Sequence, residues 1–137
     1  MTDPPRVVLA KVGLDGHDVG ILLLAKRLSN AGFEVVFLGK RNRPADVARA
    51  AVDEDAQIVG VSALSGGAGA LATKTVSALR ALGSSVPVIF GGIAEASEVD
   101  AMVAAGVARC FGPDATIEQV ARAFEELASL EDPAGSH

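Results

Sequence analysis

The stretch Arg6-Val-Val-Leu-Ala-Lys11, followed by Val-Gly-Leu-Asp15-Gly-His17-Asp18-Val-Gly20 and Ile21-Leu-Leu-Leu-Ala25, decides the fold. An apolar run of strand length leads into a polar, glycine-containing loop, and the loop leads directly into an apolar segment that begins a helix. A strand, a loop and a helix in this order form the first half of a βαβ unit. The sequence therefore predicts a parallel sheet with this loop at the carboxyl end of its first strand.

The loop contains one of only two histidines in the chain. In open α/β sheets ligands bind at the carboxyl ends of the strands, so a polar loop in this position is a candidate binding site. An imidazole can bind a metal through one ring nitrogen while the other donates to a carboxylate. Asp15 precedes His17 by two residues, and we expect the two side chains to form such a pair.

Apolar runs of strand length alternate with helical patterns along the rest of the chain. The strands are expected at about residues 6–11, 34–38, 57–62, 87–91 and 108–111. The helices are marked by caps and by apolar residues at helical spacing. These markers are Leu24, Ala25, Leu28 and Gly32 for the first helix, Pro44, Val47, Ala50 and Ala51 for the second, Val76, Leu79, Leu82 and Gly83 for the third, Ser97, Val99, Asp100, Met102, Val103 and Gly106 for the fourth, and Thr116, Ile117, Gln119, Val120, Ala121, Phe124 and Leu127 for the fifth.

Strict alternation with short connections predicts parallel strands, right-handed crossovers and helices on both faces of the sheet. Five strands at this chain length fit a flavodoxin-like, doubly wound three-layer α/β sandwich with strand order 2-1-3-4-5. The loops after strands 1 and 3 should then flank one ligand crevice. We expect a single domain over residues 1–137, with a core at about 6–127 and a disordered polar tail at 131–137.

The composition and charge of the chain exclude several classes of function. The net charge of -5 provides no basic field for nucleic acid. A single cysteine, Cys110, rules out an intramolecular disulfide framework and fits a reducing compartment. No apolar run approaches the roughly 20 residues of a membrane span, and the N-terminus lacks the features of a signal peptide. The expectation is a soluble, cytoplasmic protein without a membrane or nucleic-acid partner.

Other classes of α/β protein fit less well. Ser62 lies in Gly-Val-Ser-Ala-Leu, which lacks the second glycine of a hydrolase nucleophile elbow. The loop at 13–20 is neither a dinucleotide fingerprint nor a P-loop. A signal receiver needs acidic residues after strand 1, a phosphoacceptor aspartate after strand 3 and a lysine after strand 5, whereas this chain has Lys11, Ser62 and Phe111 there. A flavodoxin would need a hydroxyl-rich phosphate loop and aromatic residues that stack on flavin.

Three motifs follow the first, third and fourth expected strands: D-x-H-x-x-G at Asp15, His17 and Gly20, S-x-L at Ser62 and Leu64, and G-G at Gly91 and Gly92. This combination, spread over about residues 6–127, resembles the base-off, histidine-on cobalamin-binding domains of cobalamin-dependent mutases and methionine synthase. The phrase at 10–18 is most similar to the acyl-CoA mutase branch, which comprises methylmalonyl-, isobutyryl- and 2-hydroxyisobutyryl-CoA mutases. In that branch a short free-standing chain is the small subunit.

The resemblance implies that His17 is the lower ligand to the cobalt of cobalamin, in place of the cofactor's own dimethylbenzimidazole. Asp15 would accept the other imidazole N–H, and Lys11 would pair with Asp15, a relay that tunes how strongly His17 donates to the metal. Neighbouring loop residues would also contact the cofactor. These are Gly16, Asp18 and Gly20, of which Gly20 would allow the helix start to approach the corrin closely.

The resemblance further implies that the displaced nucleotide tail enters a slot between the sheet and the helices near the last strands. Ser62 would hydrogen-bond the tail, Leu64 would pack beside it, and the Gly91-Gly92 pair would let the backbone run against the base. Phe111 and Pro113, at the end of the fifth strand, complete the expected tail site.

The sequence departs from the family pattern in three places. Relatives commonly read P-G-T after the fifth strand, whereas Pro113 is followed here by Asp114 and Ala115, so a hydroxyl near the tail is missing unless Thr116 supplies it. The segment after Gly92 lacks an expected proline, and the loop at 66–69 is unusually small for one that faces the corrin.

As a function, the resemblance implies an adenosylcobalamin-dependent acyl-CoA mutase, which rearranges a carbon skeleton by radical chemistry. The substrate-binding partner would be a large subunit with a TIM-type barrel, in a heterotetramer of two large and two small subunits. The small chain would be inactive alone and would have no catalytic residue of its own beyond the relay to the cobalt ligand. A stand-alone cobalamin carrier or sensor has the same site and differs only in its partner.

Overall fold

The computed structural model describes residues 4–12, 19–39, 42–63 and 67–131. Strands and helices alternate along the chain as the sequence predicts. The elements are β1 (Arg6–Lys11), α1 (Val19–Asn30), β2 (Glu34–Phe37), α2 (Pro44–Asp53), β3 (Ile58–Ala63), α3 (Ala68–Ala81), β4 (Val88–Gly92), α4 (Ala96–Ala105), β5 (Arg109–Phe111) and α5 (Ile117–Glu131). All neighbouring strands are parallel, and their order β2-β1-β3-β4-β5 confirms the flavodoxin-like topology.

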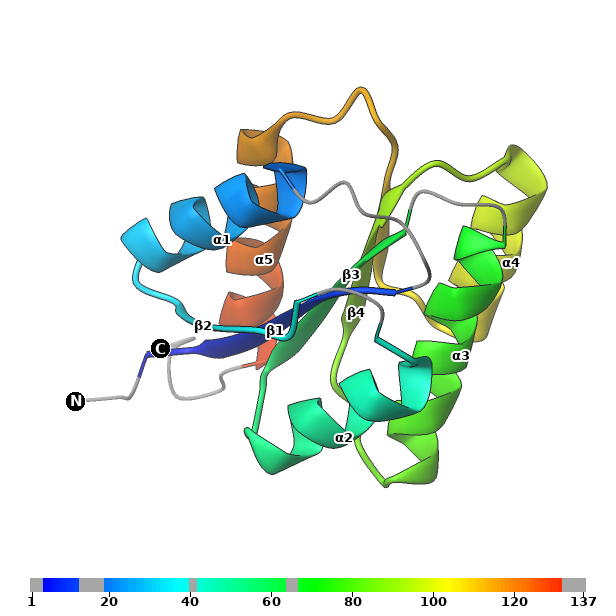
Figure 1. Ribbon diagram of the computed structural model, residues 1–137, viewed down its shortest axis with the longest axis horizontal. Coiled ribbons are helices and arrows are strands. Elements are labelled where there is room, and N and C mark those ends of the chain that lie inside the picture. Colours follow the sequence, from blue (N-terminus) through cyan, green and yellow to red (C-terminus); the bar gives the residue numbers. More distant parts are fainter. Residues whose placement is uncertain (1–3, 13–18, 40–41, 64–66, 132–137) are drawn as a thin grey trace.

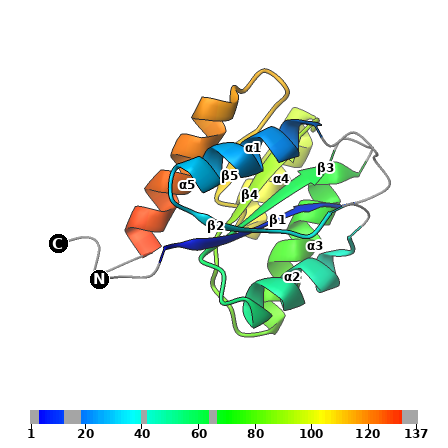
Figure 2. The same cartoon turned by 60° about the vertical axis from the view of Figure 1, so that its left-hand side comes forward.

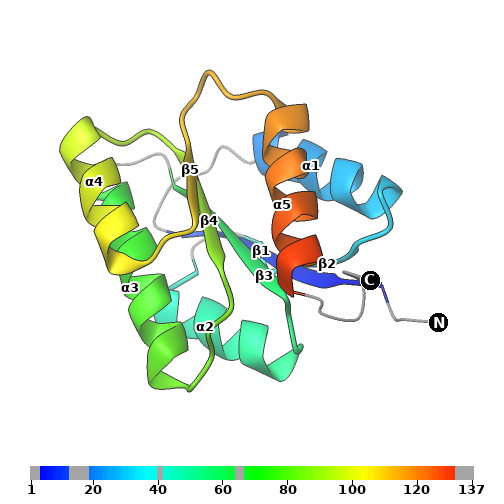
Figure 3. The same cartoon turned by 180° about the vertical axis from the view of Figure 1, so that it is seen from behind.

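The sheet is the middle layer of a three-layer sandwich (Figure 1). Helices α1 and α5 cover one face, and α2, α3 and α4 cover the other, which is clearest from behind (Figure 3). Each face has its own apolar core, because alternate residues of a strand point to opposite sides of the sheet. On β1, for example, Val8 and Ala10 belong to the core under α2, α3 and α4, whereas Val7 and Leu9 belong to the core under α1 and α5.

Helix ends follow the predicted capping chemistry at several positions. At the start of α5, the backbone N–H of Thr116 donates to Gln119 Oε1 at 2.8 Å, and the N–H of Gln119 donates to Thr116 Oγ1 at 3.1 Å. Gly32 and Gly106 follow α1 and α4 with φ values of 101° and 107°, a conformation that side chains other than hydrogen disfavour. These caps set where the chain turns back toward the sheet.

Four details of the helices differ from the sequence prediction. The capping interaction of α4 does not use Ser97 and Asp100, because the helix begins earlier and the Glu98 carboxylate accepts the backbone N–H of Glu95 at 3.1 Å. Leu82 and Val103 were expected in buried faces but are 42% and 60% exposed. Both follow the helical spacing but lie at or near the C-terminal ends of α3 and α4. Glu131, expected in the disordered tail, is the last residue of α5.

Cys110 lies half-buried on β5 and packs against the core under α2, α3 and α4. Burial raises the pKa of its thiol, which favours the protonated, unreactive form. No helix within the described ranges is long and apolar enough to cross a bilayer.

Candidate functional site

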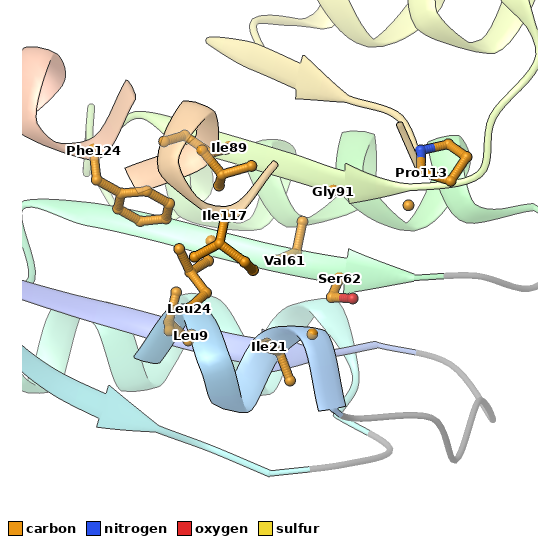
Figure 4. A pocket seen from close by; sticks show the side chains of 14 residues that line it. Leu9, Ile21, Leu24, Val61, Ser62, Ile89, Gly91, Pro113, Ile117 and Phe124 are labelled. Atoms are coloured by element: carbon orange, nitrogen blue, oxygen red, sulfur yellow. The ribbon is translucent and has the colours of Figure 1, made fainter. Parts of the chain in front are cut away.

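A cavity of about 290 Å³ lies between the sheet and the helix pair α1 and α5. Figure 2 shows these two helices side by side on one face of the sheet, and Figure 4 shows the side chains that meet between them and the strands. The strands point toward the end of the cavity where Ser62, Gly91 and Pro113 lie, and Phe124 lies at the opposite end (Figure 4). The lining residues are Leu9, Gly20, Ile21, Leu24, Gly60, Val61, Ser62, Ile89, Gly91, Gly92, Pro113, Ile117, Val120 and Phe124. The cavity opens at the end where Ser62 and Pro113 lie, because Pro113 is exposed there whereas Leu9 and Phe124 at the other end are buried.

Strand register explains why the predicted residues meet at this mouth. In the parallel sheet Lys11 is paired with Ser62, Ser62 with Gly91, and Gly91 with Phe111. Residues in one such row share a face of the sheet. Motifs that are far apart in sequence therefore form one row at the carboxyl ends of β1, β3, β4 and β5, on the side of α1 and α5.

The two glycines of the G-G motif serve different purposes. A Cβ at Gly92 would run into the backbone carbonyl oxygen of Ala63 on the neighbouring strand, so only glycine fits there. A Cβ at Gly91 would meet no heavy atom within 4 Å. Because Gly91 also lines the cavity, the missing side chain leaves open space at the mouth.

A third glycine shapes the inner end of the cavity. A Cβ at Gly60 would lie 2.7 Å from Leu9 Cδ2 and 2.8 Å from Phe124 Cζ. The Phe124 ring therefore occupies the space above Gly60, where it is completely buried. This packing closes the cavity at the end away from the carboxyl ends of the strands.

An ion pair joins the two helices that wall the cavity. Arg27 on α1 donates from Nε and Nη2 to the two carboxylate oxygens of Glu118 on α5, at 2.6 and 3.2 Å. The hydrogen bond lowers the pKa of Glu118 and raises that of Arg27. Glu125, about two helical turns further along α5, lies 3.9 Å from Arg27 Nη2.

The backbone that leads into the D-x-H-x-x-G motif is held by Asn42, which follows β2. Its side-chain amide donates to the carbonyl oxygens of Lys11 and Gly39, at 3.1 and 2.9 Å. Its backbone N–H also donates to the carbonyl oxygen of Lys11, at 3.0 Å. On the other side, the N–H of Val12 donates to the carbonyl oxygen of Ser62 at 3.0 Å. The Lys11 side chain itself is completely buried.

The predicted site residues fall into three groups. Gly20, Ser62, Gly91, Gly92 and Pro113 line the cavity, whereas Phe111 lies beside Gly91 on β5 without lining it. Thr116 does not line the cavity either, and its hydroxyl caps α5 by accepting the N–H of Gln119. The remaining predicted residues lie outside the described ranges: Asp15, Gly16, His17, Asp18 and Leu64.

Sequence reasoning missed most of the cavity wall. Leu24, Ile117, Val120 and Phe124 were expected as buried helix residues but not as parts of a site, and nothing in the sequence distinguishes a core residue from one that lines a cavity. Asn42 was also missed. The sequence could have indicated this role, because Asn42 is a polar residue in the loop after β2. The strand order places that loop beside the loop after β1.

Residues 5–122 match the family model of the B12 binding domain. The pivalyl-CoA mutase small subunit of Xanthobacter autotrophicus is 39% identical over 127 residues, which cover 92% of this chain and 85% of that protein. The methylmalonyl-CoA mutase of Cereibacter sphaeroides is 35% identical over 124 residues, which cover 90% of this chain but 18% of that protein. This chain therefore spans less than a fifth of the length of that mutase.

Solved structures agree with this match. A cobalamin-binding protein from Desulfitobacterium hafniense has a TM-score of 0.78 and 25% identity, covering 90% of this chain and 59% of that one. The signal receiver domain of NarL from Mycobacterium tuberculosis has a TM-score of 0.72, covering 93% of this chain and 98% of that one, but its 18% identity is evidence of a shared fold only. The family model matches residues 5–122, and the pivalyl-CoA mutase small subunit is similar over most of both chains. The chain therefore belongs to the B12-binding domain family, in the branch of the acyl-CoA mutase small subunits.

Proposed function

We propose that this chain binds adenosylcobalamin in the base-off, histidine-on form and, as the small subunit of an acyl-CoA mutase, presents the cofactor to a large substrate-binding subunit. The observation that carries the proposal is the apolar cavity between the sheet and the helices α1 and α5, which opens beside Ser62 and Gly91. Its mouth lies at the same edge of the sheet as Lys11 and Gly20, between which the segment with Asp15 and His17 is inserted.

The cavity fits the nucleotide tail of cobalamin in its chemistry. Dimethylbenzimidazole is a flat aromatic group with methyl substituents, and the walls offered by the described residues are aliphatic or aromatic. Gly91 leaves room at the mouth, where a larger residue would fill the entrance. The Ser62 hydroxyl, also at the mouth, would hydrogen-bond the polar part of the tail. The walls exclude water from the base and so stabilise the displaced form.

His17 would hold the cobalt, and Asp15 would accept the N–H of the ring nitrogen that faces away from the metal. Lys11 supports this assignment, because a completely buried ammonium group at the end of β1 requires compensation by neighbouring polar or negative groups. Asn42 and Ser62 fix the backbone at Lys11 and Val12, so the loop leaves the sheet from a rigid base. Gly16, Asp18 and Gly20 would lie against the corrin, Leu64 beside the tail, and Phe111 and Pro113 near its far side.

Adenosylcobalamin supplies, when bound, a cobalt–carbon bond whose homolysis provides the radical chemistry of carbon-skeleton rearrangement. The small subunit would anchor the lower face of the cofactor and leave the upper face to the partner. We propose a TIM-barrel large subunit and an assembly of two large and two small subunits. Three exposed apolar residues support a partner at this edge: Leu22 and Leu23 near the start of α1, and Ile93 directly after Gly92, which are 46%, 53% and 56% exposed.

The test is a titration of the purified chain with hydroxocobalamin and adenosylcobalamin, followed by visible absorption. After reduction to Co(II), electron paramagnetic resonance (EPR) of the wild type is expected to show superhyperfine splitting from a protein imidazole, and His17→Ala should lose it. A spectrum that retains the dimethylbenzimidazole nitrogen on cobalt would contradict the proposed binding mode.

A second experiment tests the role as a subunit. The chain is mixed with adenosylcobalamin and an acyl-CoA, with and without candidate large subunits. Isomerisation is expected only when a large subunit is present. Isomerisation by the small chain alone would contradict the proposed division of labour, whereas cofactor binding without activity with any large subunit would favour a carrier or sensor.

A further inference from the structure

The inner end of the cavity depends on one contact between a helix and a strand. Phe124 of α5 lies over Gly60 of β3, where the ring fills the space that a side chain at position 60 would need. Leu9 of β1 closes the same corner from the other side, since a Cβ at Gly60 would lie 2.7 Å from its Cδ2. We propose, on the basis of the proposed function, that Phe124 is a specificity-determining residue that sets the length of the base accepted from the cofactor tail.

The direction of entry makes the inner end decisive. The tail enters at the carboxyl ends of the strands, where Ser62, Gly91 and Pro113 lie, and Phe124 lies at the other end of the cavity (Figure 4). A group that enters from the mouth therefore advances toward the Phe124 ring. Ile89 lies between these ends (Figure 4), and Val120 also lines the cavity.

Phe124 cannot easily give way to a longer base. Its ring is completely buried, and Leu9 and Ala121 around it are 1% and 0% exposed. In a core packed to this density, even one extra methylene group forces side chains out of their preferred rotamers. A base that is longer by part of a ring should therefore bind roughly ten-fold more weakly or worse, which is the usual discrimination of an apolar pocket against one additional carbon.

The polarity of the cavity is a second, independent property that selects among lower bases. Among the described residues that line it, Ser62 alone has a polar side chain, and Ser62 lies at the mouth. A base with ring nitrogens and an amino group at its far edge would find no side-chain partner at the inner end. Replacing Phe124 with a smaller apolar residue adds space there but no hydrogen-bonding group, so it should admit longer apolar bases and not polar ones.

The experiment compares three cobamides that differ only in the lower base: dimethylbenzimidazole, the longer and apolar naphthimidazole, and the polar adenine. Dissociation constants are measured by visible absorption with wild type and Phe124→Leu, and with Phe124→Met as a second variant of nearly the same volume but with a more flexible side chain. We expect the ratio of the naphthimidazole to the dimethylbenzimidazole dissociation constant to fall roughly ten-fold in both variants. The adenine cobamide should stay weak in all three proteins.

Phe90→Leu is the matched control. Phe90 is 1% exposed, but it belongs to the core under α2, α3 and α4 and does not line the cavity. The same substitution there should destabilise the protein without changing the ratio of dissociation constants. An unchanged ratio in both Phe124 variants, with dimethylbenzimidazole cobamide still bound, would overturn this inference alone. Failure of folded wild type to bind any of the three cobamides would overturn the proposed function itself.

Discussion

Arg27 on α1 and Glu118 on α5 form a two-point ion pair, with Nε 2.6 Å from Oε2 and Nη2 3.2 Å from Oε1. The two helices provide opposite walls of the cavity, α1 through Ile21 and Leu24 and α5 through Ile117 and Val120. These four residues also belong to, or pack against, the apolar core under α1 and α5. The ion pair adds a polar attachment between the two helices to this apolar packing.

The pH dependence of stability should report this ion pair. Folding lowers the pKa of Glu118 through the hydrogen bond from Arg27, so the stabilisation is complete above the ordinary value of 4.5 and is lost as the pH falls through the lower folded value. The difference in unfolding free energy between wild type and Glu118→Gln is expected to be constant above pH 4.5 and to shrink below it. Urea unfolding at several pH values measures it.

Glu126→Gln is the control for the loss of one surface carboxylate, because Glu126 pairs with Arg109 of β5 at 3.2 Å and not with α1. High salt should reduce the effect of Glu118→Gln, since both partners are reached by solvent. A difference between wild type and Glu118→Gln that grows with acidification would contradict the assigned role of the pair.

Gly91→Ala and Gly92→Ala should have opposite effects. At Gly91 a methyl group meets nothing within 4 Å, so the free energy of unfolding should be unchanged or raised by up to about 1 kcal/mol, while cobalamin affinity should fall because the group occupies the cavity mouth. At Gly92 the methyl group would collide with the carbonyl oxygen of Ala63, and we expect a loss of stability of roughly 1–3 kcal/mol. Urea unfolding and cobalamin titration of both variants measure the contrast.

A stable Gly91→Ala protein with wild-type affinity would show that the mouth of the cavity is not where the tail passes. A Gly92→Ala protein as stable as the wild type would show that the neighbouring strand can move away from Ala63. Each variant serves as the control for the other, because both carry the same change at adjacent positions.

The fold was predictable because the sequence alternates regularly. Pro44 at the start of α2, the Thr116–Gln119 cap of α5 and the glycines after α1 and α4 all mark helix ends locally, and the structure has them where the pattern indicates. Capping of α4 was assigned wrongly, because Ser97–Asp100 and Glu95–Glu98 satisfy the same spacing and only the path of the preceding loop selects between them.

The site was predictable only in part. The motif residues Ser62 and Gly91 could be placed at one edge of the sheet from the strand order alone. The cavity could not be predicted, because it depends on whether a side chain from another element occupies the space beside each glycine. Phe124 fills the space at Gly60, and no side chain fills the space at Gly91. Such differences depend on which side chains of the covering helix lie over each strand position, which no local pattern encodes.

Asn42 should be important for the base of the D-x-H-x-x-G loop. Asn42→Ala removes the donor to the carbonyl oxygens of Lys11 and Gly39, and leaving partly buried carbonyl groups unsatisfied should cost about 1–3 kcal/mol of unfolding free energy. Asn42→Asp should cost more at neutral pH, because a carboxylate would face two carbonyl oxygens. The gap between the two variants should narrow in acid, where the aspartic acid can donate once. Equal stability of both variants at all pH values would contradict this account.

A double-mutant cycle tests the predicted pairing of Lys11 with Asp15. Lys11 is completely buried, so replacing it with methionine while a carboxylate partner remains should cost about 3–5 kcal/mol, and so should Asp15→Asn. The double variant Lys11→Met/Asp15→Asn removes both charges and should be much more stable than the sum of the single effects predicts. Lys26→Met is the matched control, because Lys26 is exposed on α1 and its effect should add to that of Asp15→Asn within about 0.5 kcal/mol. Additivity of Lys11→Met and Asp15→Asn would instead show that the buried ammonium group is compensated by another residue, and that Asp15 is not part of a relay to His17.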